Sequence, residues 1–374
     1  MWNKLKAGAD KLLGESYVCF YHSQLVAFNS RISCVSGNEN IVESQRQSIC
    51  VLGGGAMGTA CAVVLAGNGH DVRLWLRSPE YAEQIAVSRE NVRLLPGIFL
   101  PPSVLVTSDA RAALDTSSMV VVCVPTRGIR DALAEVGRFV PKQALIVSAV
   151  KGIENRTLIR PSQMIREVLG DVSVTAFGGP CHAEEVARSK PASVVAACDR
   201  IEDAETVQQV FSNGHLRVYA NNDLHGVELA AALKNVIAIA AGISDGLELG
   251  DNAKSALICR GLTEMVRFGE CLNVQRSTFY GLAGVGDLIA TCGSRHSRNR
   301  LVGELLGKGQ TLQQITSSMS AVAEGVFTAE SIFHMAQQNG IDMPIATEVY
   351  QVLFHGKPPA LATQELMQRP LREE

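Results

Sequence analysis

The chain has 374 residues, too many for one ordinary core, and its length fits two to three domains. Hydrophobic residues make up 47% and charged residues 19%, a composition typical of a globular protein and not of a disordered one. The formal net charge of −3 excludes a polybasic surface over the whole chain, so we expect no nucleic-acid partner. The most hydrophobic helical stretch, Leu229 to Ile243, is interrupted by Lys234, and we expect no transmembrane segment.

The ten cysteines form no C-x-x-C pair and no zinc-type spacing with histidines, so no metal site is expected. Several of them, including Cys50 and Cys123, stand inside apolar runs, where a thiol behaves as a small hydrophobic group. The N-terminus lacks the basic, apolar and small-residue segments of a signal peptide. We therefore expect a cytoplasmic protein in a reducing compartment.

Residues 1–47 show no sustained helical or strand period and end in a polar stretch. Three interpretations stay open: a flexible extension, a start codon placed too early, or an organelle transit segment. Asp10 and Glu15 disfavour the last, because transit segments contain few acidic residues. We assign no chemistry to this segment.

From Ser48 onward, short strands rich in Val and Ile alternate with helical segments. The expected strands cover residues 48–53, 71–77, 104–108, 119–125, 144–152, 173–180 and 191–198. Such runs are typical of strands buried on both faces of a parallel sheet, and the helices between them suit right-handed crossovers. The pattern predicts an α/β domain with a Rossmann-type doubly wound sheet over residues 48–223.

The strand pattern stops after about residue 223, and helical periodicity follows. The expected helices cover residues 224–243, 252–272, 298–307, 323–340 and 344–356, several of them closed by glycine. This pattern predicts an all-helical C-terminal domain over residues 224–374. Since no linker composition separates the two parts, we expect them to pack closely.

A G-x-G-x-x-G sequence formed by Gly53, Gly55 and Gly58 follows the first strand and opens a helix. In this context the first glycine allows a tight turn, the second admits a pyrophosphate, and the third lets helix and strand pack closely. The motif therefore predicts a dinucleotide cofactor. The alternative is a glycine-rich turn without a ligand.

The second strand ends in Arg77 and Ser78, without the carboxylate that usually accepts hydrogen bonds from the ribose of NAD. An arginine at this position can hold a 2′-phosphate or stack on adenine. NADP(H) is therefore favoured and NAD(H) stays open. The alternative is a solvated arginine after a strand.

Two further strand ends carry groups suited to an anionic substrate, because ligands of open α/β sheets bind beyond the carboxyl ends of the strands. Lys151 follows one strand, and Gly179 lies in a turn with Cys181 and His182 after the next. Lys151 and His182 could each equally be a surface residue. Taken together, they mark one edge of the sheet as the candidate site.

Lys234 interrupts an otherwise apolar helix. Desolvation lowers the pKa of such a lysine towards neutrality, and it can then exchange a proton with a carbonyl oxygen that receives hydride. The alternative is a lysine whose stem passes the core on its way to solvent. We favour Lys234 as the general acid/base.

Two later segments extend the candidate site. Asp287 lies in a glycine-rich turn ahead of an apolar run, where a plain helix cap is the alternative. Arg295, Arg298 and Arg300 surround Ser297 at a helix start, a pattern typical of a phosphate site and also of a solvated basic helix.

The chain resembles the bacterial-type NAD(P)-dependent glycerol-3-phosphate dehydrogenases from about residue 48 to its end. The resemblance rests, in order, on GGGAMGTA, VKG, GGPCHAEE, VELAAALKNVIAIAAGISDGL, NAKSAL, GLAGVGDLIATC, SRNR and AEG. It implies reversible reduction of dihydroxyacetone phosphate, a small phosphorylated substrate, to sn-glycerol 3-phosphate for glycerophospholipid synthesis. A homodimer is left open.

The resemblance also assigns roles to residues. Lys234 matches the general acid/base, with Asp287 beside it. The implied substrate contacts are Lys151, Gly179, Cys181, Lys234, Asp287, Ser297, Arg298 and Asn299. The implied cofactor contacts, beyond the three glycines, are Ala56, Met57, Arg77, Lys151, Ala183, Arg298, Val322 and Glu324.

Cys181 departs from the family, which usually has Ser or Thr at this position, and a thiol is a weaker hydrogen-bond donor than a hydroxyl. Two alternative functions remain. A 3-hydroxyacid or 6-phosphogluconate dehydrogenase would share the fold plan and an active lysine, although the SRNR segment and the turn before Asp287 argue against it. A non-catalytic NADP(H)-binding sensor would not need both Lys234 and Asp287.

Overall fold

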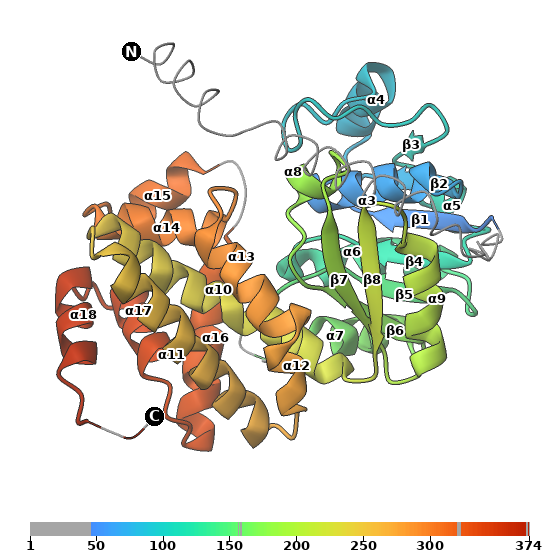
Figure 1. Cartoon of the computed structure of the whole chain (residues 1–374). Helices are drawn as coiled ribbons and strands as arrows, with labels where there is room; N and C mark the ends of the chain where they lie inside the picture. The colour runs from blue at the N-terminus through green and yellow to red at the C-terminus, as the bar shows by residue number, and fades with distance from the viewer. Residues whose placement is uncertain (1–45, 156, 158, 320–322, 372, 374) are drawn as a thin grey trace, which may run out of the picture. The chain divides into compact units, whose positions relative to one another are not determined.

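The computed structural model describes residues 46–155, 157, 159–319, 323–371 and 373. The interpretations of residues 1–45 and the cofactor contact expected at Val322 lie outside the described residues. Within the described part, an eight-stranded sheet is followed along the chain by helices (Figure 1).

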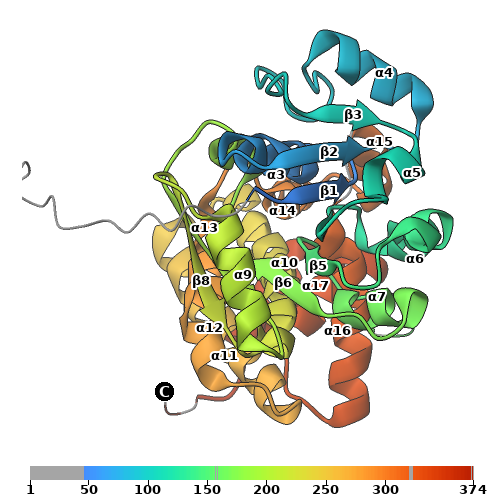
Figure 2. The ribbon, with the colours of Figure 1, turned by 90° about the vertical axis from the view of Figure 1, so that its right-hand side faces the viewer.

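The strands of the sheet lie in the order β3-β2-β1-β4-β5-β6-β7-β8. They are β1 (Ser48–Leu52), β2 (Asp71–Trp75), β3 (Leu105–Thr107), β4 (Met119–Val122), β5 (Leu145–Ser148), β6 (Val174–Gly178), β7 (Ala192–Ala197) and β8 (Leu216–Asn221). In Figure 2 the strands descend from β3 through β2 and β1 to β5 and β6. The order reverses direction between β1 and β4, which makes the sheet doubly wound as predicted.

Two details of the sheet differ from the sequence prediction. β7 runs antiparallel to β6, whereas the other neighbouring strands pair in parallel. A buried apolar strand has the same composition in either direction, so the pattern could not reveal this. β8, which the sequence prediction missed, lies at the sheet edge and alternates between buried and exposed residues.

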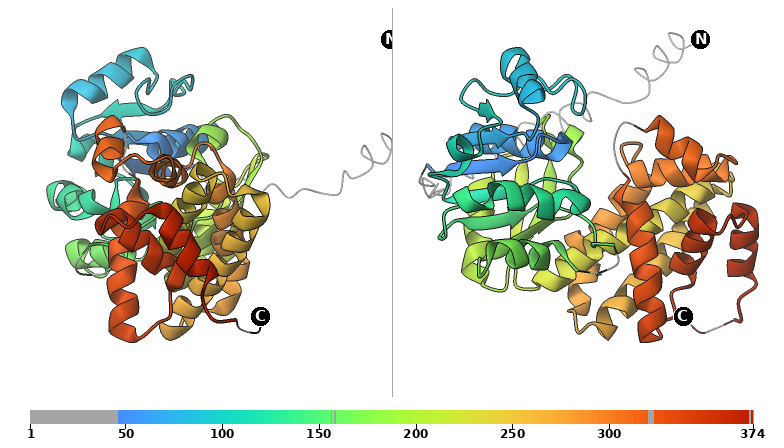
Figure 3. Two further views of the ribbon diagram at one scale, coloured as in Figure 1. Left: turned by 90° about the vertical axis from the view of Figure 1, so that its left-hand side faces the viewer. Right: turned by 180° about the vertical axis from the view of Figure 1, so that it is seen from behind.

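Helices cover both faces of the sheet, because alternate residues of each strand point to opposite sides. Ile49 and Val51 pack into the cluster formed with α3 (Ala56–Gly67), α4 (Pro79–Ser88) and α9 (Ile201–Phe211). Cys50 and Leu52 pack into the opposite cluster, with α5 (Ala110–Leu114), α6 (Ile129–Val136) and α7 (Pro161–Leu169). Figure 3 (right) shows α6 and α7, in green, on this second face.

The remaining chain is helical, as predicted, around the long buried helix α10 (Leu224–Gly246). Around it lie α11 (Gly250–Cys271), α12 (Arg276–Tyr280), α13 (Asp287–Gly293), α14 (Arg298–Gly307), α15 (Leu312–Ser318), α16 (Glu324–Asn339), α17 (Pro344–Phe354) and α18 (Pro359–Met367). α10 is longer than the stretch singled out by its hydropathy. Among the described residues it is the one helix long and apolar enough to cross a membrane, yet 94% of its most apolar window is buried inside the protein.

Candidate active site

The glycine-rich loop between β1 and α3 has the shape that close approach of a ligand requires. A Cβ on Gly58 would lie 1.9 Å from the carbonyl oxygen of Gly53, so only glycine fits against the turn. A Cβ on Gly55 would instead meet nothing nearer than the Cys123 carbonyl oxygen at 3.9 Å, which leaves space in front of the loop. Gly55 is also the N-cap of α3 and supplies no side-chain cap to the amides of the first turn. Backbone amides and space are what a pyrophosphate needs, so the loop fits a dinucleotide.

A buried asparagine that the sequence did not single out supports this loop. The Asn91 side-chain amide donates to the Gly54 carbonyl oxygen at 2.9 Å and to Thr59 Oγ1 at 2.8 Å. Asn91 is fully buried and also accepts a hydrogen bond from the Tyr81 hydroxyl. No local motif marks this asparagine, so sequence reasoning had no signal for it.

Arg77 lies just beyond β2, as predicted, and pairs with Glu135 at 2.9 Å. The side chains of both residues are about half exposed, at 51% and 49%. Exposed pairs of this kind contribute little to stability. Little free energy is therefore needed to separate Arg77 from Glu135, so a more highly charged anion such as a phosphate can take the place of Glu135.

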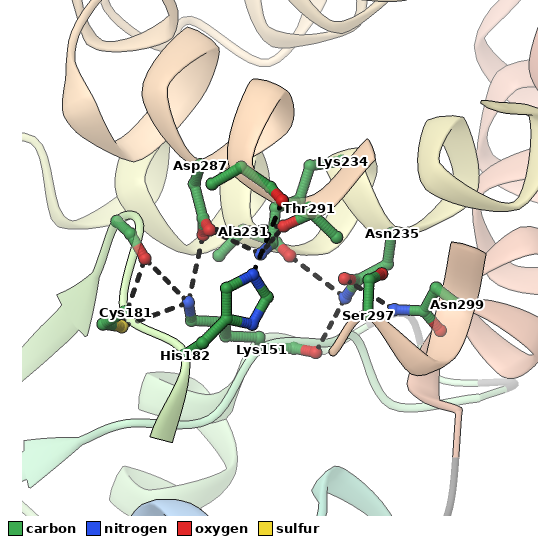
Figure 4. Close-up of polar contacts among 12 residues, drawn as sticks. Lys151, Cys181, His182, Ala231, Lys234, Asn235, Asp287, Thr291, Ser297 and Asn299 are labelled. Carbon is green, nitrogen blue, oxygen red and sulfur yellow. Dashed lines mark hydrogen bonds and ion pairs between the residues drawn. The ribbon is translucent and has the colours of Figure 1, made fainter. Parts of the chain in front are cut away.

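Lys234, Asp287 and Lys151 meet in one ion-pair network (Figure 4). Lys234 Nζ lies 2.7 Å from Asp287 Oδ1, and Lys151 Nζ lies 3.1 Å from Asp287 Oδ2. Lys234 Nζ also donates to Thr291 Oγ1 at 2.7 Å. The sheet supplies Lys151, whereas α10 and α13 supply the other two charges, so the network joins the two parts of the fold.

Burial and charge act against each other in this network. Burial lowers the pKa of Lys234 to about 8, although Asp287 attracts its proton. Burial alone would raise the pKa of Asp287, but Lys151 and Lys234 outweigh it and hold that pKa below its usual value. Burial also lowers the pKa of Lys151, yet Asp287 and Cys181 beside it raise it above the ordinary lysine value. Lys234 is thus the lysine of the pair whose proton is exchangeable near neutral pH.

The turn after β6 contacts Lys151 directly. Lys151 Nζ donates to the Gly179 carbonyl oxygen at 2.9 Å and lies 3.4 Å from Cys181 Sγ. Gly179 has a φ of +115°, which favours glycine there. Burial raises the pKa of the Cys181 thiol, so it stands neutral beside the lysine. His182 lies at the same site, and burial lowers its pKa.

A chain of amides links this site to the start of α14. Asn235 Nδ2 donates to the Lys151 carbonyl oxygen at 3.2 Å, and Asn299 Nδ2 donates to Asn235 Oδ1 at 2.9 Å. Asn299 Oδ1 in turn accepts from the Gly325 amide at 2.9 Å. Sequence reasoning did not single out Asn235 or Thr291. A second polar residue beside Lys234 in an apolar helix was the available signal for Asn235.

The start of α14 departs in part from its prediction. Ser297 caps the helix by accepting from the Arg300 amide at 3.2 Å, and Arg298 is exposed at the first position. Arg300 points elsewhere, because its guanidinium pairs with Asp245 at 2.5 Å and Glu304 at 3.1 Å. Arg300 is therefore not part of the arginine cluster that the sequence predicted around Ser297.

Glycines bring α14 against α10 at backbone distance. A Cβ on Gly242 would lie 1.9 Å from the Arg300 carbonyl oxygen, and one on Gly303 would lie 1.9 Å from that of Ile239. Gly246 and Gly307 meet one turn further along the same crossing. The helix that carries Ser297 and Asn299 is therefore fixed against the helix that carries Lys234.

Several expected cofactor contacts share one position in the fold, because each is the first residue of a helix. Ala56 opens α3 and is followed by Met57, Ala183 opens α8 (Ala183–Val186), and Glu324 opens α16. Burial raises the pKa of Glu324, with Thr126 and Arg127 nearby opposing the shift. Among the described residues, no group of three or more His, Cys, Asp or Glu side chains could hold a metal ion.

Comparison with known proteins agrees with this geometry. A glycerol-3-phosphate dehydrogenase (NAD(P)+) of Chlorobium phaeobacteroides is 47% identical over 329 residues, covering 87% of this chain and 98% of that protein. One from Geobacillus kaustophilus is 47% identical over 331 residues, covering 88% and 96%. The crystal structure of glycerol-3-phosphate dehydrogenase from Coxiella burnetii superposes with a TM-score of 0.83 at 33% identity, covering 87% of this chain and 99% of that chain.

Two family profiles also match, and together they span the sheet and the helices. Residues 48–204 match the N-terminus of NAD-dependent glycerol-3-phosphate dehydrogenase, and residues 223–364 match its C-terminus. The chain belongs to the NAD-dependent glycerol-3-phosphate dehydrogenase family.

Proposed function

We propose that the chain catalyses the reversible NAD(P)H-dependent reduction of dihydroxyacetone phosphate to sn-glycerol 3-phosphate. The observation that carries this proposal is the buried Lys234, held 2.7 Å from Asp287 and with a pKa lowered to about 8. A lysine in this state can give and take a proton near neutral pH. The product would supply glycerophospholipid synthesis.

Lys234 is the proposed general acid/base. The nicotinamide ring, when bound, supplies the hydride in reduction and accepts it in oxidation. The Lys234 ammonium donates its proton to the ketone oxygen during reduction, and the neutral Lys234 amine removes the hydroxyl proton during oxidation. Asp287 holds the ammonium in place and offsets the charge of Lys151.

The proposed phosphate contacts are Ser297, Arg298 and Asn299 at the start of α14, where helix amides and a guanidinium favour an anion. Lys151, Gly179 and Cys181 complete the proposed substrate contacts. Net charge did not reveal such a site, because a chain of net charge −3 gathers these cations locally.

The proposed cofactor contacts are the glycine-rich loop with Ala56 and Met57, together with Arg77, Lys151, Ala183, Arg298, Val322 and Glu324. We propose NADP(H) as the preferred cofactor, since Arg77 and not a carboxylate follows β2. Replacing Arg77 with Ala should raise KM for NADPH about tenfold and leave KM for NADH unchanged. Equal effects on both cofactors would contradict this preference, and Glu135→Gln serves as the control that frees the arginine.

We further propose a dinucleotide-binding domain over residues 48–223, a helical substrate domain over residues 224–374 and a cytoplasmic location. A homodimer is the oligomeric state we would test first, by light scattering of the purified chain. These proposals are independent of the catalytic one.

A spectrophotometric assay tests the function. Purified protein should oxidise NADPH when dihydroxyacetone phosphate is added, and Lys234→Ala should abolish turnover while cofactor binding persists. Turnover of 3-hydroxyacids or 6-phosphogluconate instead would favour the related dehydrogenases. Tight NADPH binding without any turnover would favour a sensor.

A further inference from the structure

Glu228 is a buried carboxylate of α10 that the proposed reaction does not use. Its side chain is 1% exposed, and burial raises its pKa. Burying a carboxylate is costly unless hydrogen bonds replace its water. An isolated acid at this position would therefore destabilise the fold, which makes its partners informative.

The partners of Glu228 all come from the start of α7, on the sheet side of the fold. Glu228 accepts hydrogen bonds from the Ser162 amide at 2.7 Å and from Ser162 Oγ at 2.6 Å. Arg160 Nη1 lies 3.4 Å from the same carboxylate. The carboxylate thus accepts the Ser162 amide in the first turn of α7, whose Arg160 amide Gln163 accepts, and ties that helix to α10.

The connection that ends at α7 is the one that begins at β5 and carries Lys151. α10 holds the start of this connection as well, because Asn235 Nδ2 donates to the Lys151 carbonyl oxygen at 3.2 Å. Lys234 stands on α10 between the two attachment points, about 1.7 turns after Glu228 and directly before Asn235. One helix therefore carries the proton-exchanging lysine and both attachments of the second lysine's segment.

We propose that Glu228 is a positioning residue, which keeps the Lys151 ammonium against Asp287 beside Lys234 by fastening the start of α7 to α10. The inference rests on the proposed function of Lys234. Glu228 touches neither substrate nor cofactor in this assignment. It acts through the segment that carries Lys151.

The position of Lys151 has an electrostatic consequence that can be measured. The positive charge of Lys151 lowers the pKa of Lys234, and Lys151 also shares the Asp287 carboxylate that raises it. The other titratable groups that face Lys234 are Cys181, His182 and Cys292, and the charged groups beside Glu228 include Arg160 and Arg166. If Lys151 moves away, Lys234 loses the repulsion of a neighbouring positive charge. It also no longer shares the Asp287 carboxylate with Lys151, so the pKa of Lys234 rises.

The test variant is Glu228→Gln, which keeps the size of the side chain and replaces one acceptor oxygen with a donor. We expect a folded protein whose kcat falls about tenfold to a hundredfold, the effect of a small displacement at a reacting site. The pH at which reduction declines, expected near the Lys234 pKa of about 8 in the unaltered enzyme, should move upward. Ser162→Ala should produce a smaller shift in the same direction, and the double variant should be less than additive.

Glu264→Gln is the matched control. Glu264 is also a buried carboxylate that accepts two amides at a helix start, from Ile345 at 2.7 Å and Ala346 at 3.2 Å on α17. It should change stability and leave the pH profile in place. A Glu228→Gln enzyme with unchanged kcat and profile would overturn the proposal, as would equal pH shifts in both Gln variants. If Glu228→Gln does not fold, an unmoved profile in Ser162→Ala overturns it.

A titration by ¹³Cε-lysine NMR, with the Lys234 signal assigned from Lys234→Arg, separates this proposal from the proposed function. The Lys234 pKa should rise in Glu228→Gln even if the unaltered protein fails to reduce dihydroxyacetone phosphate. That failure would remove the proposed function alone. An unchanged Lys234 pKa in an active enzyme would remove the positioning role alone.

Discussion

Lys234 and Asp287 form a 2.7 Å ion pair in which the two side chains are only 5% and 3% exposed. A second ammonium, Lys151, contacts the other carboxylate oxygen of Asp287 at 3.1 Å. One buried anion thus faces two cations, of which Lys234 is buried and Lys151 is 20% exposed. This excess of positive charge suits a site that receives an anionic substrate.

Replacing Asp287 with Asn should remove the only anion of this network while preserving its shape. Lys234 then loses the charge that favours its protonated form, so its pKa falls and reduction at pH 7 slows by about a hundredfold or more. Steady-state kinetics and cofactor titration test this, with unchanged cofactor affinity as the internal control. Near-normal kcat would show that Asp287 does not support Lys234.

The pH dependence of the reaction should differ between its two directions. Reduction requires protonated Lys234, whose pKa burial lowers to about 8, so its kcat should decline as the pH rises through about 8. Oxidation requires the neutral amine, so its kcat should increase over the same range. Profiles of kcat measured in both directions check this. If kcat changed with pH in the same way in both directions, Lys234 would not be the general acid/base.

Cys181→Ser should improve substrate binding. A hydroxyl is a better donor and acceptor than the neutral thiol that now lies 3.4 Å from Lys151 Nζ. We expect KM for dihydroxyacetone phosphate to fall by about threefold with little change in kcat. Cys50→Ser, the same change at a fully buried strand position, should lower the melting temperature without altering KM. A KM that does not respond at Cys181 would place this side chain outside the substrate site.

Gly58→Ala should weaken cofactor binding by about a hundredfold or more, because the new Cβ would lie 1.9 Å from the Gly53 carbonyl oxygen. The loop has to move, and its amides then no longer face a pyrophosphate. Fluorescence titration with NADPH measures the change. Gly67→Ala, at the other end of the same helix, meets nothing within 4 Å and should leave affinity intact.

Glu264 should make stability depend on pH. Burial raises its pKa from 4.5 to about 7, so the folded protein binds a proton that the unfolded chain releases between these values. Stability from this group is therefore greatest below pH 4.5 and falls by about 3 kcal/mol as the pH rises through 7. Urea unfolding from pH 5 to 8 should show a flatter dependence in Glu264→Gln. Equal slopes would mean that Glu264 titrates normally.

The architecture was largely predictable because apolar strands and long amphipathic helices leave a periodic signal. β8 escaped prediction because its residues alternate between buried and exposed at a sheet edge. The direction of β7 also escaped, since burial on both faces leaves no trace of strand polarity.

The sequence singled out the main charged side chains of the candidate site one by one, but not the contacts between them. Lys234 and Asp287 were each conspicuous, one as a charge in an apolar helix and the other in a glycine-rich turn. That Asp287 also pairs with Lys151 depends on how the sheet and helices pack, which no local pattern encodes. Asn91 and Thr291 act through partners distant in sequence, and nothing around them predicts their roles.

The close glycine-mediated crossing of α10 and α14 fixes the distance between the two helices, and with it the length of substrate that fits between them. Gly242 and Gly303 leave no side chain between the two helices, so main-chain contact sets the separation of the Lys234 helix from the helix of the proposed phosphate contacts. A side-chain substitution within the site can change its polarity or width but cannot move these two ends apart. Acceptance of a longer phosphorylated ketone would therefore require larger residues at the crossing itself, remote from any atom that reacts.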